Sequence, residues 1–329
     1  MITVLKPGLL TTVQDLGRPG YQQYGVVVGG ALDSFAARVA NLIVGNADGA
    51  AVVELAQTGP ELRFEQDSLV AWCGADFDAR IGNQPLAQDR ATFVAGGESV
   101  TFGLARSGLR AWLAVAGGID VPLVLGSRST YRRAGIGGHE GRPLAAGDIL
   151  KLGGPSERAN QTIGALRVAG RRAANWTVRP GTLGRSGPGG TVRAVRGPEW
   201  AWFNPAAQHL IFAAEWLATK ESDRMGVRLH GPSLMLAKPR EMISSAVNTG
   251  VVQVPGDGQP IVLLPSRQSV GGYPRLAAVV AADIGKIAQL RPGDKVRFQE
   301  VTLPAAHELS LGRERDLSRI RTGLARMAV

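Results

Sequence analysis

The chain has 329 residues, of which 44% are hydrophobic and 19% charged, and its formal net charge is +10 at pH 7. This length predicts two domains, and the balance of hydrophobic to charged residues excludes disorder and fibrous repeats. The basic residues are scattered and aromatic residues make up only 5%, so a nucleic-acid-binding surface is not expected.

The first distinctive segment is TTVQDLGRPG at residues 11–20. Arg18 offers a planar fork of donors, Asp15 offers an ionised acceptor and Gln14 offers one group of each kind. The glycines of the segment permit backbone angles that other residues resist. We expect a surface turn here, either reading a small polar group through Gln14, Asp15 and Arg18 or closed by a local ion pair between Asp15 and Arg18.

Helices are expected at four places along the chain. Apolar residues at helical spacing predict one over Asp33–Val44, with Asp33 as a cap and Gly45 as the stop. Short helices are expected after Asn204 and after Asp283, each of which could cap the residues that follow. The spacing of apolar residues near the end predicts an amphipathic helix over 306–329.

The remaining chain is rich in Gly and Pro between β-branched runs, which predicts a mainly β protein with short strands and tight turns. Four landmarks recur in the same order and indicate two related halves. They are GPELRF, GNQPL, AGGIDVP and AAGDILKL in the first half, and GPSLML, DGQPI, VGGYP and RPGDKVRF in the second. We therefore divide the chain into 1–190, 191–305 and the helix 306–329, with an exposed connection or a long hairpin over about 153–198.

Three further clusters are candidates for binding a small polar ligand. They comprise Ser127 and Arg128 in LGSRSTYRR, then Ser222, Asp223 and Arg224 in ESDRMGVRL, and finally Gln253, Gln268 and Tyr273 in the segment 249–274. Hydroxyls beside Arg128 suit a carboxylate or an oxyanion. The alternatives are hydroxyls that bond their own backbone, an ion pair at a strand end, and an amide that bonds a neighbouring loop.

Several other chemistries have no support in the sequence. The four His residues lack metal-ligand spacing, and neither a Walker A pattern nor a G-x-S-x-G elbow occurs. Cys73 is the only cysteine, so no disulfide is expected within one chain. The amino terminus lacks a signal-peptide core and no stretch approaches 18 apolar residues, so we expect a cytoplasmic protein without membrane segments.

An ordered set of motifs resembles the allophanate hydrolase subunit 2 family. The set runs through TTVQDLGRPGYQQYGV, ARVANLIVGN, LGSRST, SDRMGVRL, GVVQVPGDGQPI, QSVGGYP and AQLRPGD, from about residue 3 to 301. The family includes the C subunit of bacterial ATP-dependent 5-oxoprolinase, the sporulation regulator KipA and the carboxyltransferase domain of urea carboxylase. The resemblance implies two cyclophilin-like β-barrel halves and a subunit 1 partner, which in 5-oxoprolinase is the B subunit.

The resemblance also implies a ligand class, because 5-oxoproline is a cyclic amide and biotin a cyclic urea. We expect Gln14, Asp15 and Arg18 to recognise the N–H and C=O of such a ring. ATP is the implied co-substrate, bound by this chain or by its partner. In the carboxyltransferase alternative, carboxybiotin carried by another protein takes the place of ATP. In the KipA-like alternative, the chain binds a kinase inhibitor and catalyses no reaction. The chain departs from the family at Ser245 and Ser266, where relatives tend to carry acidic residues.

Overall fold

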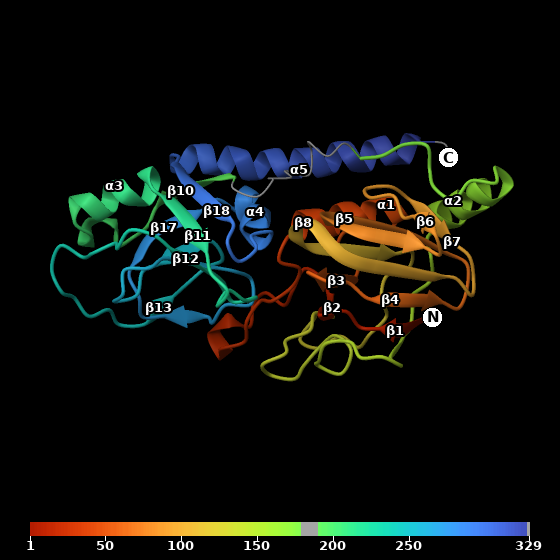
Figure 1. Ribbon diagram of the computed structural model, residues 1–329, viewed down its shortest axis with the longest axis horizontal. Helices are drawn as coiled ribbons and strands as arrows, with labels where there is room; N and C mark the ends of the chain where they lie inside the picture. Colours follow the sequence, from red (N-terminus) through yellow and green to blue (C-terminus); the bar gives the residue numbers. More distant parts are fainter. Residues whose placement is uncertain (179–189, 328–329) are drawn as a thin grey trace. The chain divides into compact units, whose positions relative to one another are not determined.

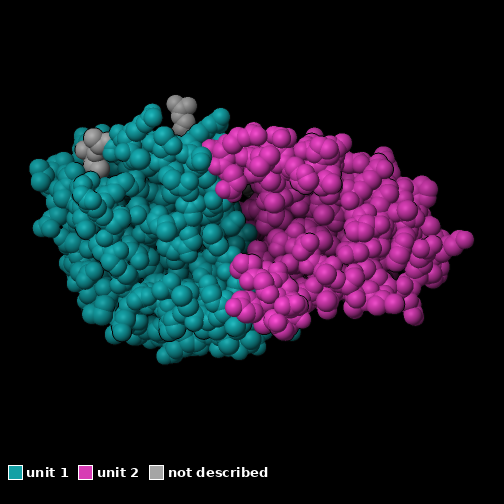
Figure 2. All heavy atoms as spheres, turned by 180° about the vertical axis from the view of Figure 1, so that it is seen from behind, with its two compact units in different colours: residues 1–18, 29–183, 316–329 teal, residues 19–28, 184–315 magenta. Residues whose placement is uncertain are grey.

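The structure of the protein is a computed structural model that describes residues 1–178 and 190–327. It divides into two compact units, unit 1 with residues 1–18, 29–183 and 316–329, and unit 2 with residues 19–28 and 184–315 (Figures 1 and 2). The division at 183/184 lies near the boundary placed at 190, but unit 2 also takes residues 19–28 and unit 1 takes the last residues of the final helix. The middle of the expected connection, 179–189, lies outside the described residues.

Nine strands form one sheet among the described residues of unit 1 (Figure 1). They are β1 Ile2–Lys6, β2 Leu10–Gln14, β3 Val52–Ala56, β4 Glu61–Phe64, β5 Ser68–Ile81, β6 Gln84–Pro85, β7 Thr92–Val94, β8 Ser99–Val115 and β9 Ile149–Leu150. The main path runs β2-β3-β8-β4-β1-β9, and β5 pairs with β6, β7 and β8. Three register shifts interrupt the pairing of β5 with β8, and such bulges bend and twist long strands.

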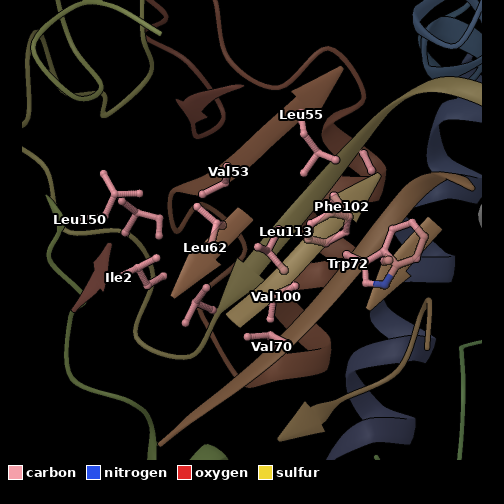
Figure 3. Packing of buried hydrophobic residues seen from close by; sticks show 14 of the residues in the cluster. Ile2, Val53, Leu55, Leu62, Val70, Trp72, Val100, Phe102, Leu113 and Leu150 are labelled. Carbon is pink, nitrogen blue, oxygen red and sulfur yellow. The ribbon is translucent and has the colours of Figure 1, made fainter. Parts of the chain in front are cut away.

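Figure 3 shows one cluster of buried hydrophobic residues in the core of unit 1. The cluster includes three mutually edge-on rings, Trp72, Phe77 and Phe102, with centroids 5.5 to 6.4 Å apart. Helix α1, Ser34–Val44, packs against β5 and β8. It begins where Asp33 accepts a hydrogen bond from the Ala36 amide and ends at Gly45 in the left-handed conformation, as predicted. A second helix, α2, spans Glu157–Val168.

Unit 2 contains a closed barrel of seven strands in the order β10-β17-β14-β15-β12-β11-β18. Its strands are β10 Thr191–Arg196, β11 Glu215–Ala218, β12 Gly226–His230, β14 Val251–Gln253, β15 Ile261–Leu263, β17 Arg275–Val279 and β18 Lys295–Glu300. The parallel pairing of β10 with β18 closes it. A separate ribbon joins β13 Ser245–Ala246 to β16 Val270–Gly271. The mainly β class with barrel-type halves is confirmed, and the structure adds that the sheet of unit 1 is a half-barrel.

The remaining α-helices are α3 Pro205–Ala213, α4 Ile284–Ala288 and α5 Leu303–Arg326, and short 3-10 turns span Gln22–Tyr24, Trp200–Trp202 and Ala281–Asp283. Asn204 caps α3 through the Ala207 amide, as predicted. The cap predicted for α4 is wrong, because the Asp283 side chain makes no capping bond. Its fully buried carboxylate instead accepts hydrogen bonds from the Arg193 backbone and guanidinium and so ties α4 to β10.

Candidate functional site

The carboxylate of Asp15, directly after β2, is the centre of a hydrogen-bond network in unit 1. Its Oδ1 accepts from the Ser127 hydroxyl at 2.6 Å, from the Ser129 hydroxyl and from the Gly17 amide at 2.7 Å. Its Oδ2 accepts from the Arg128 amide at 2.6 Å. The expectation of a surface turn is therefore wrong, because Asp15 is only 8% exposed and both serines are fully buried.

Arg18 lies beside Asp15 but does not form the local ion pair that was the alternative for this turn. Its guanidinium is 1% exposed and donates to the backbone oxygens of Val124, at 3.3 Å, and of Ser129. Burial lowers the pKa of Arg18, and the nearby charge of Asp15 opposes this effect. The third nitrogen, Nη1, is buried and has no hydrogen-bond partner among the described residues.

Gln14, one residue before Asp15, is also buried and also donates to the backbone of the same loop. Its amide nitrogen donates to the Thr12 hydroxyl at 3.0 Å and to the backbone oxygen of Thr130 at 3.4 Å. Its Oε1 is buried and has no hydrogen-bond partner in the described part of the chain. Gln14 and Arg18 thus bond neighbouring carbonyls of one loop, and each retains one unused polar atom, an acceptor on Gln14 and a donor on Arg18.

The loop that receives these bonds also forms part of the wall of a cavity of about 870 Å³ in unit 1. The cavity is lined by residues 120–124, Arg128, residues 135–141, Ile149 and Lys151. This loop region is drawn in yellow-green beside β1 and β2 in Figure 1, and backbone bonds from Thr130 to Val13 and from Leu144 to Thr11 hold it there. Asp15 therefore fixes the backbone position from which Arg128 enters the cavity wall.

Gly137 is the point of contact between Arg18 and the cavity wall. Its φ of +68° is strained for any residue with a side chain, and a Cβ there would lie 2.6 Å from Arg18 Nη2 and 2.1 Å from the Ser129 oxygen. Glycine at this position therefore allows the wall to pack directly on the buried guanidinium.

Of the residues that the sequence singled out, five come together in unit 1. They are Gln14, Asp15, Arg18, Ser127 and Arg128. The other six, Ser222, Asp223, Arg224, Gln253, Gln268 and Tyr273, belong to unit 2. Whether any of the eleven is catalytic or binds substrate stays a prediction.

In unit 2 the predicted residues lie in a turn, in a strand and in the connections on either side of β16. Asp223 is exposed and accepts from the Met225 and Gly226 amides, and the Ser222 hydroxyl bonds the backbone of Arg228. Gln253 is buried in β14 and donates to the Tyr273 oxygen at 3.3 Å, which is the loop contact considered as its alternative. The side chains of Gln268 and Tyr273 are exposed.

The sequence did not point to Arg267, which lies between Ser266 and Gln268. It is 5% exposed and donates to the Val247 oxygen at 3.1 Å and to the Thr249 hydroxyl at 3.0 Å, and burial lowers its pKa. Nor did the sequence point to Lys151, His139 or Glu140 in the cavity wall of unit 1. The four glycines of GIGGHEG at 135–141 were the available signal, since they mark close approach of a backbone.

Neither a metal centre nor a membrane-spanning helix is found in the described part of the chain. No cluster of three or more His, Cys, Asp or Glu side chains there could hold a metal ion. None of the described helices is both long and apolar enough to cross a membrane.

Comparison with known proteins identifies the family. The family model of the carboxyltransferase domain, subdomain A and B, matches residues 24–300. The chain belongs to this carboxyltransferase-domain family. It is 38% identical over 306 residues to the 5-oxoprolinase C subunit of Escherichia coli (strain K12), covering 93% of each chain. It is 36% identical over 321 residues to the 5-oxoprolinase C subunit of Haemophilus influenzae, covering 98% of each.

Among solved structures, the urea amidolyase of K. lactis superposes with a TM-score of 0.87 at 28% identity. The match covers 97% of this chain but only 20% of that one, so the chain corresponds to one part of a much longer protein. These findings confirm the family resemblance drawn from the motifs, and they make the chain a homologue of one component of a multi-subunit enzyme.

Proposed function

We propose that this chain is the C-type component of an ATP-dependent 5-oxoprolinase, which opens the lactam 5-oxoproline to glutamate together with a B-type partner. The observation that carries the proposal is the similarity to two 5-oxoprolinase C subunits over more than nine tenths of both chains in each pair. The urea amidolyase likeness covers only a fifth of its counterpart and so says less about the complete activity.

The chemistry required is activation of a stable amide. The lactam oxygen takes the γ-phosphoryl group of ATP and ADP leaves. Water then adds to the activated carbon, the C–N bond breaks with the nitrogen retained as an amine, and a second water releases phosphate from the resulting acyl phosphate. Donors aimed at the oxygen favour this sequence because negative charge develops there.

Gln14 and Arg18 suit the recognition of such a ring. A lactam presents an N–H beside a C=O, and the unused acceptor on Gln14 and the unused donor on Arg18 are complementary to these groups. Both atoms are buried, and Nη1 of Arg18 lies near Gly29, so we propose that substrate reaches them when the backbone that covers them moves. Asp15 is assigned to holding the Ser127–Ser129 loop, because its own oxygens are already engaged by four donors.

The test is turnover by the assembled enzyme. The chain is co-expressed with a subunit 1 homologue from the same organism, and release of ADP and formation of glutamate are measured with and without 5-oxoproline. We expect ADP release that depends on the lactam. Gln14→Ala should raise KM for 5-oxoproline, whereas Gln161→Ala, on exposed α2, should leave it unchanged.

A stable complex that releases no ADP with 5-oxoproline would refute the proposal. The second candidate, a biotin-dependent carboxyltransferase component, is favoured by the carboxyltransferase-domain match and the amidolyase superposition. It predicts that carboxybiotin on a carrier protein loses its carboxyl group in the presence of the complex. Tight binding of a kinase inhibitor with neither reaction would indicate a KipA-like regulator.

A further inference from the structure

The cavity of unit 1 is larger than the proposed lactam requires. Its volume of about 870 Å³ falls in the range typical of small-molecule sites, and a single five-membered ring with one carboxylate would fill a small part of it. The cavity therefore has room for a larger ligand, and the lining residues define the chemistry of that ligand.

Positive charge dominates one part of this lining. Lys151 is exposed and makes no ion pair with any described residue, and Arg128 reaches the same wall. Arg18 lies directly behind the wall at Gly137, with one nitrogen bonded to the oxygen of cavity residue Val124. The neighbouring carboxylate of Asp15 partly offsets the charge of Arg18, so Arg128 and Lys151 supply the positive charge that a ligand in the cavity meets directly.

The acidic residues of the cavity do not cancel this charge. Asp120 bonds Arg128 at 3.1 Å, and Glu140 bonds Arg142 at 2.8 Å, outside the lining set. His139 faces Asp148 at 3.4 Å. Lys151 and Arg18 therefore remain without a carboxylate bond, and Arg128 has only a partly exposed one, which an anion could replace or share.

Apolar side chains line another part of the same cavity. Leu123 and Ile149 line the cavity and are 59% and 55% exposed, and Pro122 is exposed beside them. The segment 135–141 carries four glycines, and a Cβ at Gly135 would meet nothing within 4 Å. An apolar surface and two cations in one cavity fit a ligand with a flat apolar part and a polyanionic part.

We propose that this cavity binds a nucleoside triphosphate, with its phosphates toward Arg128 and Lys151 and its base against Pro122, Leu123 and Ile149. The proposal rests on the proposed function, since that reaction consumes ATP, and it assigns the nucleotide to this component of the enzyme. Arg128 and Lys151 neutralise phosphate charge.

Binding is measured by calorimetry on the isolated chain and on its complex with the partner subunit. We expect affinity to fall in the order ATP, ADP, AMP, and inorganic tripolyphosphate to compete with ATP. Lys151→Met and Arg128→Met should each weaken ATP binding at least about tenfold, because each removes one charge-assisted contact. Lys220→Met, an exposed lysine of unit 2, is the matched control and should not change it.

The position of the base is tested by photo-crosslinking with 8-azido-ATP, followed by peptide mapping. Crosslinks should fall within residues 120–124 or on Ile149. Because Arg128 has packing roles, its variant is first checked for an unchanged melting temperature, and the exposed Lys151 variant keeps the test decisive if Arg128→Met is unstable.

Failure of the site and failure of the function give different results. The site is refuted and the function retained if 5-oxoproline drives ATP turnover but neither variant changes ATP affinity. Crosslinks confined to the partner subunit, in an enzyme that turns over, have the same meaning. ATP binding that responds to both variants, in a complex that never acts on 5-oxoproline, retains the site and removes the function. Competition by 5-oxoproline and not by tripolyphosphate would make the cavity a carboxylate site and contradict the proposal.

Discussion

Replacing Asp15 with alanine should destabilise unit 1 strongly. The change removes the acceptor for four donors and leaves the O–H groups of the fully buried Ser127 and Ser129, and the Arg128 amide, without an acceptor. An orphaned buried donor costs about 1–3 kcal/mol, and partial relaxation of the loop keeps the sum below three full penalties. We expect a loss of about 3–5 kcal/mol in the free energy of unfolding.

The assay is urea unfolding followed by tryptophan fluorescence, because Trp72 and Trp112 are buried in unit 1 and Trp216 is buried in unit 2, so both units contribute to the signal. Asp223→Ala is a matched control. Its carboxylate also accepts from backbone amides, at Met225 and Gly226, but it is exposed in a turn, so water replaces the lost acceptor. That variant should lose less than about 1 kcal/mol.

Asp15→Asn separates charge from shape. It keeps one acceptor oxygen but directs an N–H₂ group toward donors, so we expect about half the loss of the alanine variant, on the order of 2 kcal/mol. Hydrogen exchange at the Arg128 amide should accelerate in both variants. If Asp15→Ala costs no more than Asp223→Ala, the carboxylate does not organise the loop and the reasoning fails.

Two further predictions concern the same unit. Gly137→Ala should cost clearly more than Gly135→Ala in urea unfolding, since both have positive φ but only the former would collide with Ser129 and Arg18; equal losses would mean that Arg18 does not pack on the wall. Hydrogen bonds from Arg142 lower the pKa of Asp148 from 3.8 to about 2, so this pair's contribution is complete above about pH 4 and is lost as the pH falls through about 2. The loss is at most about 2 kcal/mol, and Asp148→Asn should abolish this part of the pH dependence of stability; an unchanged profile would contradict the assignment.

Local signals predicted the elements of the fold that depend on local interactions. The helix after Asp33 and the helix after Asn204 were found because each cap bonds an amide three residues along the chain. The cap at Asp283 was predicted by the same rule and failed, because Arg193, 90 residues away, offers the carboxylate a charged partner that a nearby amide cannot match.

The candidate site was predictable in its residue types and not in its geometry. The motif at 11–20 and the segment LGSRST were both singled out, yet nothing in either showed that Asp15 bonds Ser127 and Ser129 across more than 100 residues. Long-range register decides that contact. Lys151 carries no local pattern, and although His139 lies in the glycine-rich segment 135–141, only the folded chain brings the two residues into one cavity wall.

Arg18 in unit 1 and Arg267 in unit 2 are both buried arginines that donate to neutral oxygens. Each is almost completely buried, bonds backbone oxygens or a hydroxyl, and has no hydrogen bond to a carboxylate among the described residues. Burying a cation in this way is costly, and a loop could be fixed at lower cost by a neutral donor. The cost is reasonable where the positive potential itself is useful, and for Arg18 the neighbouring space is a cavity with further cations in its wall. An anionic ligand there would recover part of the desolvation free energy of the guanidinium, so ligand binding should raise the stability of unit 1.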